Sequence, residues 1–186
     1  MAIPFKDLSR DRLAESAGYL RFIEGRNGER FGALFLMDEW GEPVEFTHAR
    51  IKAPSSFLWR PDDLRTHCIR SLCVAMFDAC PRSPLFMLCL ADEVGPHVFS
   101  ENIRLQIPVG RVARSDLPVT VSPHESSEPE TRSEAGTEFS VYWTQAPEPG
   151  SEARRLFDAV VGRGMLFEPF QRMEAGLREV YADGAV

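Results

Sequence analysis

The clearest pattern of apolar and polar positions in this chain lies within residues 17–91. Tyr19–Glu24 alternates in the manner of a strand, and Phe31–Met37 continues as a second strand. Between them, the turn Gly25–Gly28 contains residue types that tolerate a positive φ. A second turn leads into Val44–Ile51, which alternates again. These segments predict a three-stranded antiparallel meander.

A long helix and a very apolar strand are predicted after the meander. Asp62 or Asp63 can cap a helix whose apolar stripe runs from Leu64 to Ala79, with a second apolar row beside it. A helix that is apolar over so much of its circumference is expected to be contacted on two sides. The run Leu85–Leu90 is continuously apolar, which is typical of a central strand covered on both faces.

The remaining segments complete the element order. Asp92–Asn102 can form a helical turn or a short helix after Gly95-Pro96. Arg104–Val112 is predicted to form a further strand, and because Pro108 interrupts it, this strand is expected at an edge of the sheet. Glu138–Thr144 alternates as a last strand, and helices are predicted over Ser151–Val161 and from Glu168 onward.

The domain organisation follows from one abrupt change in composition. Residues 114–137 are rich in Ser, Pro, Glu and Thr and hold few large apolar side chains, so they predict an acidic disordered insertion. Residues 1–113 then form the core α+β domain. Residues 138–186 add the final strand and the C-terminal helices, which complete the same domain.

The predicted fold class is α+β, with a three-stranded antiparallel meander followed by α-β-α-β and then by C-terminal helices. This element order resembles the ribonuclease H-like topology. The alternative is a roadblock- or longin-like sheet with helices. Both resemblances concern the order of elements alone, and element order does not license a function.

Composition narrows the class of protein. With 44% hydrophobic and 26% charged residues among 186, the chain has the make-up of a soluble domain with one real core. Its formal charge of −7 disfavours a dominant surface for polyanions, so nucleic acid is not the favoured partner. A local basic row could still contact phosphates, and Arg65 and Arg70 on the long helix are the candidates.

Cellular location is inferred from apolar runs and cysteines. No apolar run approaches the ~20 residues needed to cross a bilayer, so no membrane association is expected. The four cysteines lie among large apolar neighbours, as small buried side chains would. Reduced thiols fit a cytoplasmic protein.

The ribonuclease H-like resemblance implies carboxylates on the first strand, on the long helix and at the end of the central strand, converging on Mg²⁺. The candidates for such a catalytic site are Asp92, Glu93 and Glu24. Only Asp92, directly after the central strand, stands where such a nuclease needs it. A metal-dependent nuclease is therefore kept as an alternative function.

Other catalytic signatures are absent from the sequence. It has no paired C-x₂-C units, no G-x-x-x-x-G-K-[ST] phosphate loop, no G-x-G-x-x-G and no G-x-S-x-G. The sequence therefore predicts no metal site, no cofactor and, on balance, no enzyme.

Two apolar segments favour a protein interface instead. Phe57, Leu58 and Trp59 lie together in a loop, and the last helix carries Phe170, Met173 and Leu177 at near-heptad spacing. Extended apolar patches on a surface mark interfaces, whereas the same side chains packed on each other would be ordinary core. The preferred hypothesis is a non-enzymatic accessory subunit of a multi-protein assembly, which binds a protein partner or self-associates through these residues.

Overall fold

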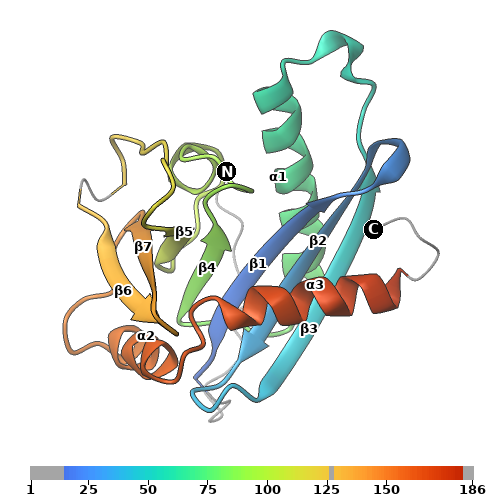
Figure 1. Cartoon of the computed structure of the whole chain (residues 1–186). Coiled ribbons are helices and arrows are strands. Elements are labelled where there is room, and N and C mark those ends of the chain that lie inside the picture. The colour runs from blue at the N-terminus through green and yellow to red at the C-terminus, as the bar shows by residue number, and fades with distance from the viewer. Residues whose placement is uncertain (1–14, 126–127, 182–186) are drawn as a thin grey trace.

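The strands of this chain are hydrogen-bonded side by side into one mixed sheet, as seen in a computed structural model that describes residues 15–125 and 128–181 (Figure 1). Seven strands of the described residues form it, in the order β3-β2-β1-β4-β5-β7-β6. β1 pairs in parallel with β4, and β4 with β5, while the remaining pairs are antiparallel. The strands are β1 (Ala17–Glu24), β2 (Glu29–Met37), β3 (Pro43–Lys52), β4 (Phe86–Leu90), β5 (Val109–Arg114), β6 (Glu130–Glu134) and β7 (Thr137–Trp143). The fold class is α+β.

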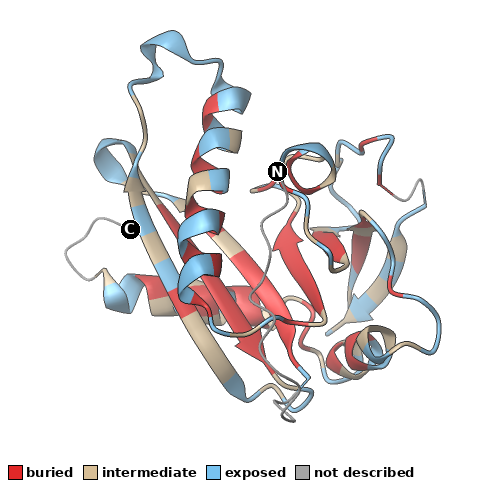
Figure 2. Ribbon diagram, turned by 180° about the vertical axis from the view of Figure 1, so that it is seen from behind, coloured by how far each residue is buried: buried red, intermediate tan, exposed pale blue. Residues whose placement is uncertain are grey.

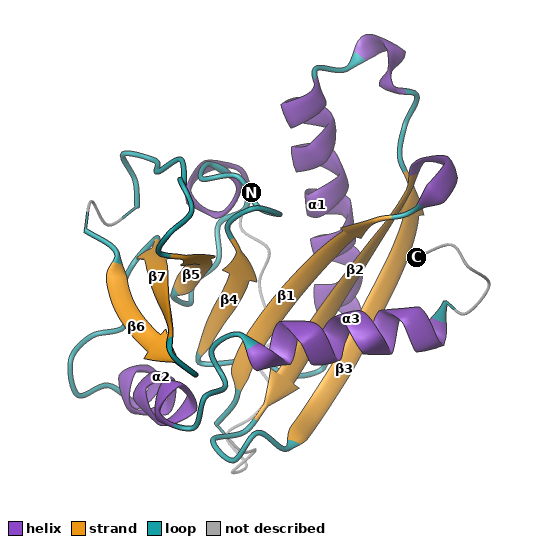
Figure 3. Cartoon of the chain, in the orientation of Figure 1, coloured by secondary structure: helices purple, strands orange, loops and turns teal. Residues whose placement is uncertain are grey.

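Helices cover both faces of this sheet (Figure 3). α1 (Pro61–Ala79) packs on one face, whereas α2 (Glu152–Gly162) and α3 (Glu168–Val180) pack on the other. Three short helical turns lie in the connections: η1 (Arg26–Gly28), η2 (Ser56–Leu58) and η3 (Val98–Asn102). No helix of the described ranges is both long enough and apolar enough to cross a bilayer.

Each face of the sheet has its own apolar core because successive side chains of a strand point to opposite faces. On β1, Tyr19 joins the core under α2 and α3, while Leu20 joins the core under α1. Every residue of β4 is buried, as its continuous apolar run predicts (Figure 2). β1 and β4 therefore form the centre of the molecule.

Helix α1 differs from the sequence prediction at its start and on its outer side. Neither Asp62 nor Asp63 caps it, because the helix begins at Pro61, whose fixed φ suits the first helical position. The two carboxylates lie in the first turn, where the helix dipole favours negative charge. The helix packs on the sheet with one side only, and Val74 on the other side is 39% exposed.

Part of the segment predicted to be a disordered insertion, residues 114–137, is regular structure. β6 pairs with β7 along its length and forms one edge of the sheet. The charged residues that favoured disorder have partners: Glu130 accepts a hydrogen bond from Trp143 Nε1 at 2.9 Å, and Glu134 accepts one from the Leu166 N–H at 2.6 Å.

The segments before β5 agree with the prediction in part. The helical turn predicted within 92–102 is η3, whereas the strand predicted from Arg104 begins only at Val109, directly after Pro108. β5 also lies between β4 and β7 rather than at the predicted edge of the sheet, because Pro108 precedes the strand and does not interrupt its ladder. In the first hairpin the turn does adopt the positive φ that its residue types suggest, at Asn27 and Gly28.

Candidate functional site

The carboxyl ends of β1, β4 and β5 meet at one edge of the sheet because these strands are parallel. The chain leaves β1 toward β2 on one side and leaves β4 toward β5 on the other. Such a switch in direction opens a crevice beyond the strand ends, which is where open α/β sheets usually bind ligands. Glu24 is the last residue of β1, and Asp92 and Glu93 follow β4.

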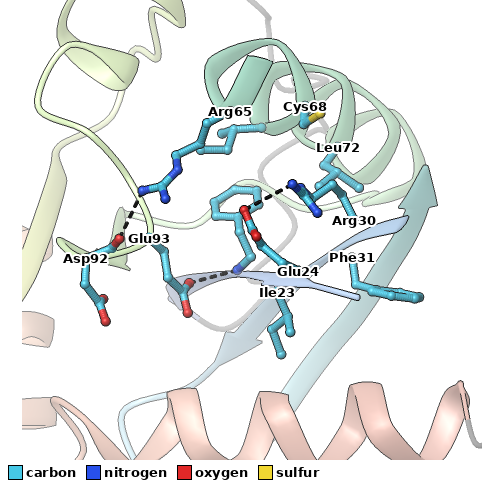
Figure 4. Close-up of a pocket in the computed structure, with 11 residues that line it drawn as sticks. Ile23, Glu24, Arg30, Phe31, Arg65, Cys68, Leu72, Asp92 and Glu93 are labelled. Atoms are coloured by element: carbon cyan, nitrogen blue, oxygen red, sulfur yellow. Dashed lines mark hydrogen bonds and ion pairs between the residues drawn. The ribbon is translucent and has the colours of Figure 1, made fainter. Parts of the chain in front are cut away.

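A small pocket of about 130 Å³ opens between α1 and this end of β1 (Figure 4). Its apolar lining comes mainly from Phe22 on β1 and from Ile69 and Leu72 on α1. The charged side chains that line it are Glu24, Arg30, Arg65, Asp92 and Glu93. The structure thus brings all three carboxylates of the proposed nuclease set to one pocket.

Arginines and a backbone amide engage two of these three carboxylates. Glu93 accepts a hydrogen bond from the Phe22 N–H at 2.9 Å and forms a salt bridge of 3.0 Å with Arg21. Glu24 forms a salt bridge of 3.2 Å with Arg30. Beside them, Arg65 donates to the backbone carbonyl of Asp92 over 3.4 Å.

Glu93 lies in a strongly desolvated part of this pocket. Burial raises the pKa of its carboxyl from 4.5 to about 7, against the opposing effects of Arg21 and of the Phe22 N–H. Arg21 also binds Glu174 on α3 at 2.8 Å, so one guanidinium links two carboxylates from different elements. Glu93 is therefore protonated more easily than an ordinary glutamate, although Arg21 favours its charged form.

This arrangement does not suit a metal site built on Glu24, Asp92 and Glu93 together. Within the described ranges, no three His, Cys, Asp or Glu side chains gather in a way that could hold a metal ion. A metal at Glu93 would also have to displace the Arg21 guanidinium, which carries the same sign of charge. The carboxylates lie close together, but the positive charges of Arg21 and Arg30 beside them would repel a metal cation.

Sequence reasoning missed Arg21, Arg30 and Glu174. Arg21 stands between Leu20 and Phe22 in a strand whose other side chains are mostly buried. A charged residue on a face covered by a helix needs a partner of opposite charge. The position of Arg21 among buried neighbours could therefore have indicated a buried ion pair. Of the two arginines proposed for nucleic acid, Arg65 lines the pocket, whereas Arg70 is exposed and is not part of its lining.

The loop between β3 and α1 presents a second candidate site. Phe57 is 87% exposed, Leu58 is 85% exposed and Trp59 is 38% exposed. We call these three residues the apolar tip. Figure 1 shows their loop extending beyond the end of the sheet, and Figure 2 shows it as largely exposed. Trp59 has a ring neighbour, His67, with the ring centroids 4.9 Å apart.

The prediction that Phe170, Met173 and Leu177 contact a partner is wrong. All three side chains are buried in the core between α3 and the sheet. Phe170, for instance, packs edge-on against the ring of Tyr19, with the centroids 5.3 Å apart. Their near-heptad spacing reflects a helix lying on a sheet inside one molecule, because a helix that packs on any flat apolar surface needs the same stripe.

The cysteines offer no reactive thiol. Cys68, Cys73, Cys80 and Cys89 are free and buried, and burial raises the pKa of each thiol. A thiol that stays protonated at neutral pH is a poor nucleophile and a poor metal ligand.

In sequence, the chain matches no protein-family profile and no curated protein. Its function is therefore inferred from the chemistry of the pocket between α1 and the end of β1, and from that of the apolar tip.

Proposed function

We propose that this chain is a non-enzymatic binding subunit that docks on a protein partner through the apolar tip. The observation that carries the proposal is the exposure of Phe57 and Leu58, two large apolar side chains that belong to neither core. Burying such a side chain is worth about 1.5–3 kcal/mol, so a partner that covers both gains several kcal/mol of binding free energy.

The base of the tip favours binding as well. Trp59 rests on His67 of α1, and Pro61 follows two residues later at the start of the helix. These contacts fix the tip to a rigid element, which lowers the entropy lost when a partner binds. Aromatic side chains are also enriched among the residues that dominate binding energy at interfaces.

We further propose that the sheet has the ribonuclease H-like topology. The order β3-β2-β1-β4-β5, with an antiparallel β1-β2-β3 and with β4 and β5 parallel to β1, supports this proposal. The β6-β7 hairpin would then be an addition beyond β5. The arginines beside Glu24 and Glu93 favour a binding role over the alternative of a metal-dependent nuclease.

A photo-crosslinking experiment in the producing cells tests the proposed interface. A benzophenone amino acid replaces Phe57 in one variant and Trp40 in the control, because Trp40 is an aromatic residue 65% exposed at a different turn. The expected result is a discrete covalent adduct from position 57 that is missing from position 40. Adding Leu58→Ser and Trp59→Ser to the first variant is expected to abolish the adduct.

The outcomes separate the alternatives. An adduct of twice the subunit mass, also formed by the purified chain alone, identifies the partner as a second copy. Equal labelling from positions 57 and 40, or no adduct from either, would overturn the proposed function.

A further inference from the structure

A second and larger cavity lies beyond the carboxyl ends of β4 and β5. Its volume is about 490 Å³, and it shares Arg65 and Asp92 with the pocket described above. Sites for small organic ligands typically measure about 300–1,000 Å³. The cavity thus has the size and the place in the sheet at which such ligands bind.

The walls of this cavity are largely apolar. Leu90 and Val112 contribute from the ends of β4 and β5, Leu117 and Val119 from the loop after β5, and Phe167 from the start of α3. The Phe167 ring is held by stacking on Phe139, with centroids 5.3 Å apart and planes 18° from parallel. A fixed aromatic ring in an apolar wall suits a planar ligand group.

Cations dominate the charged part of the lining. Arg21, Arg65, Arg111 and Arg114 all line the cavity, whereas Asp92 is the one carboxylate among the lining residues. Arg111 is locked by buried Glu125, and Arg21 is held by Glu93 and Glu174. These two arginines are therefore already neutralised.

Arg65 and Arg114 are available to a ligand. Among the described residues, the Arg65 guanidinium makes one hydrogen bond, the long contact of 3.4 Å to the Asp92 carbonyl. Arg114 donates two hydrogen bonds to the Asp116 carboxylate, of 3.1 and 2.8 Å, but both side chains are more than half exposed. Because solvent screens a pair that is this exposed, a phosphate, which also accepts two parallel hydrogen bonds, can compete with Asp116 for the guanidinium.

We propose that this cavity binds a nucleotide, with Arg65 and Arg114 on the phosphate and the base against Phe167 and Leu117. Guanidinium groups match phosphate oxygens in a bidentate geometry, and they come here from two different elements, α1 and β5. The apolar walls accept a planar ring that inorganic phosphate lacks. This site is separate from the apolar tip, and its occupancy does not depend on the proposed protein partner.

Titration calorimetry of the full chain with AMP at about 0.15 M salt tests the proposal. AMP is expected to bind, while adenosine, ribose 5-phosphate and inorganic phosphate each bind at least tenfold more weakly. Arg65→Ala and Arg114→Ala are each expected to weaken AMP binding about tenfold or more. Arg70→Ala removes the same charge from the same helix outside the cavity, so it is the matched control and should leave the affinity unchanged.

Several results would overturn the nucleotide site. These are no heat of binding with millimolar AMP, an equal loss in the Arg65→Ala and Arg70→Ala variants, or binding of a single-stranded oligonucleotide while AMP fails to bind. Since Arg65 and Arg114 are exposed, their variants should keep the thermal unfolding curve of the parent, which verifies folding. Phe57→Ser should leave AMP binding intact, so failure of the protein interface and failure of this site are distinguishable.

Discussion

At the scale of single residues, Glu93 has a carboxyl group whose desolvation outweighs the stabilisation of its charge by neighbouring groups. Arg21, from β1, and the Phe22 N–H favour the ionised carboxylate, whereas Asp92 in the same loop and Glu174 on α3 oppose it. Desolvation outweighs the favourable contacts, and the pKa settles at about 7 rather than 4.5.

This pKa predicts a specific dependence of stability on pH. Between about pH 4.5 and 7, the native chain keeps a proton on Glu93 that the unfolded chain has released. The contribution of Glu93 to the free energy of unfolding therefore rises as the pH falls through 7 and levels off near 4.5, by at most about 3 kcal/mol.

Urea unfolding of the parent and of Glu93→Gln at pH 5, 6, 7 and 8 measures this contribution. The parent is expected to gain stability relative to the variant as the pH is lowered, since all other groups titrate in both proteins. A stability difference that stays constant across the four pH values would contradict the assignment.

Gly110 on β5 is a second residue whose substitution has a predictable effect. A Cβ at this position would lie 2.8 Å from Val141 Cγ1 and 3.0 Å from Leu88 Cδ2. Gly110→Ala is therefore expected to lower the free energy of unfolding by about 1–3 kcal/mol. Gly162→Ala is the control, because nothing lies within 4 Å of its added Cβ, and it should be neutral or slightly stabilising. Chemical unfolding of both variants at one pH compares them.

At the scale of elements, one buried ion pair fixes the loop that follows β5. The Arg111 side chain donates to Glu125, to the Val94 carbonyl at 3.0 Å and to the Thr120 carbonyl at 2.8 Å. Arg111 is 3% exposed and Glu125 is fully buried. The loop is thus fastened to the centre of the sheet rather than left free.

Removing the carboxylate should release that loop. Glu125→Ala leaves a buried guanidinium without its counter-charge, which is expected to cost about 3–5 kcal/mol of stability. Hydrogen exchange should then speed up at the backbone amides of residues 115–124. Glu128→Ala, which removes an exposed carboxylate from the same segment, should change neither quantity; similar effects from both variants would argue against the clamp.

Sequence patterns predicted the elements that bury one face or both, since burial leaves a periodic trace in β1, β2, β3 and α1. They missed β6, because its residues Glu130–Glu134 are all polar and therefore show no alternation of apolar and polar positions. In the structure these residues alternate between partly buried and exposed positions. Glu24, Asp92 and Glu93 were selected from position in the strands. Their arginine partners were not, because Arg21 and Glu174 are 153 positions apart and no local pattern joins them.

At the scale of the whole molecule, the central sheet separates two cores, and only one of the two predicted contact segments is free of them. Phe170 is buried under α3, whereas Phe57 stands in solvent. Phe170→Ala should cost about 3–5 kcal/mol, and Phe57→Ala should change stability by less than about 0.5 kcal/mol.

Thermal unfolding of these two variants decides whether the apolar tip is independent of folding. The expected result is a large fall in melting temperature for Phe170→Ala and none for Phe57→Ala. A comparable fall in both would mean that the tip packs on the rest of the chain in solution, and the protein interface would lose its support.

The contact between α3 and β1 has a consequence for how the chain is made. Tyr19 of β1 donates a hydrogen bond of 2.7 Å to the carbonyl of Met165, 146 positions later, and Phe170 covers its ring. During translation, β1, β2 and β3 can pair as soon as they have been made. The apolar face of β1 that α3 covers stays exposed to solvent until α3 has left the ribosome. Nascent chains stalled before residue 165 should therefore recruit chaperones, and those chaperones should be released only after α3 has left the ribosome.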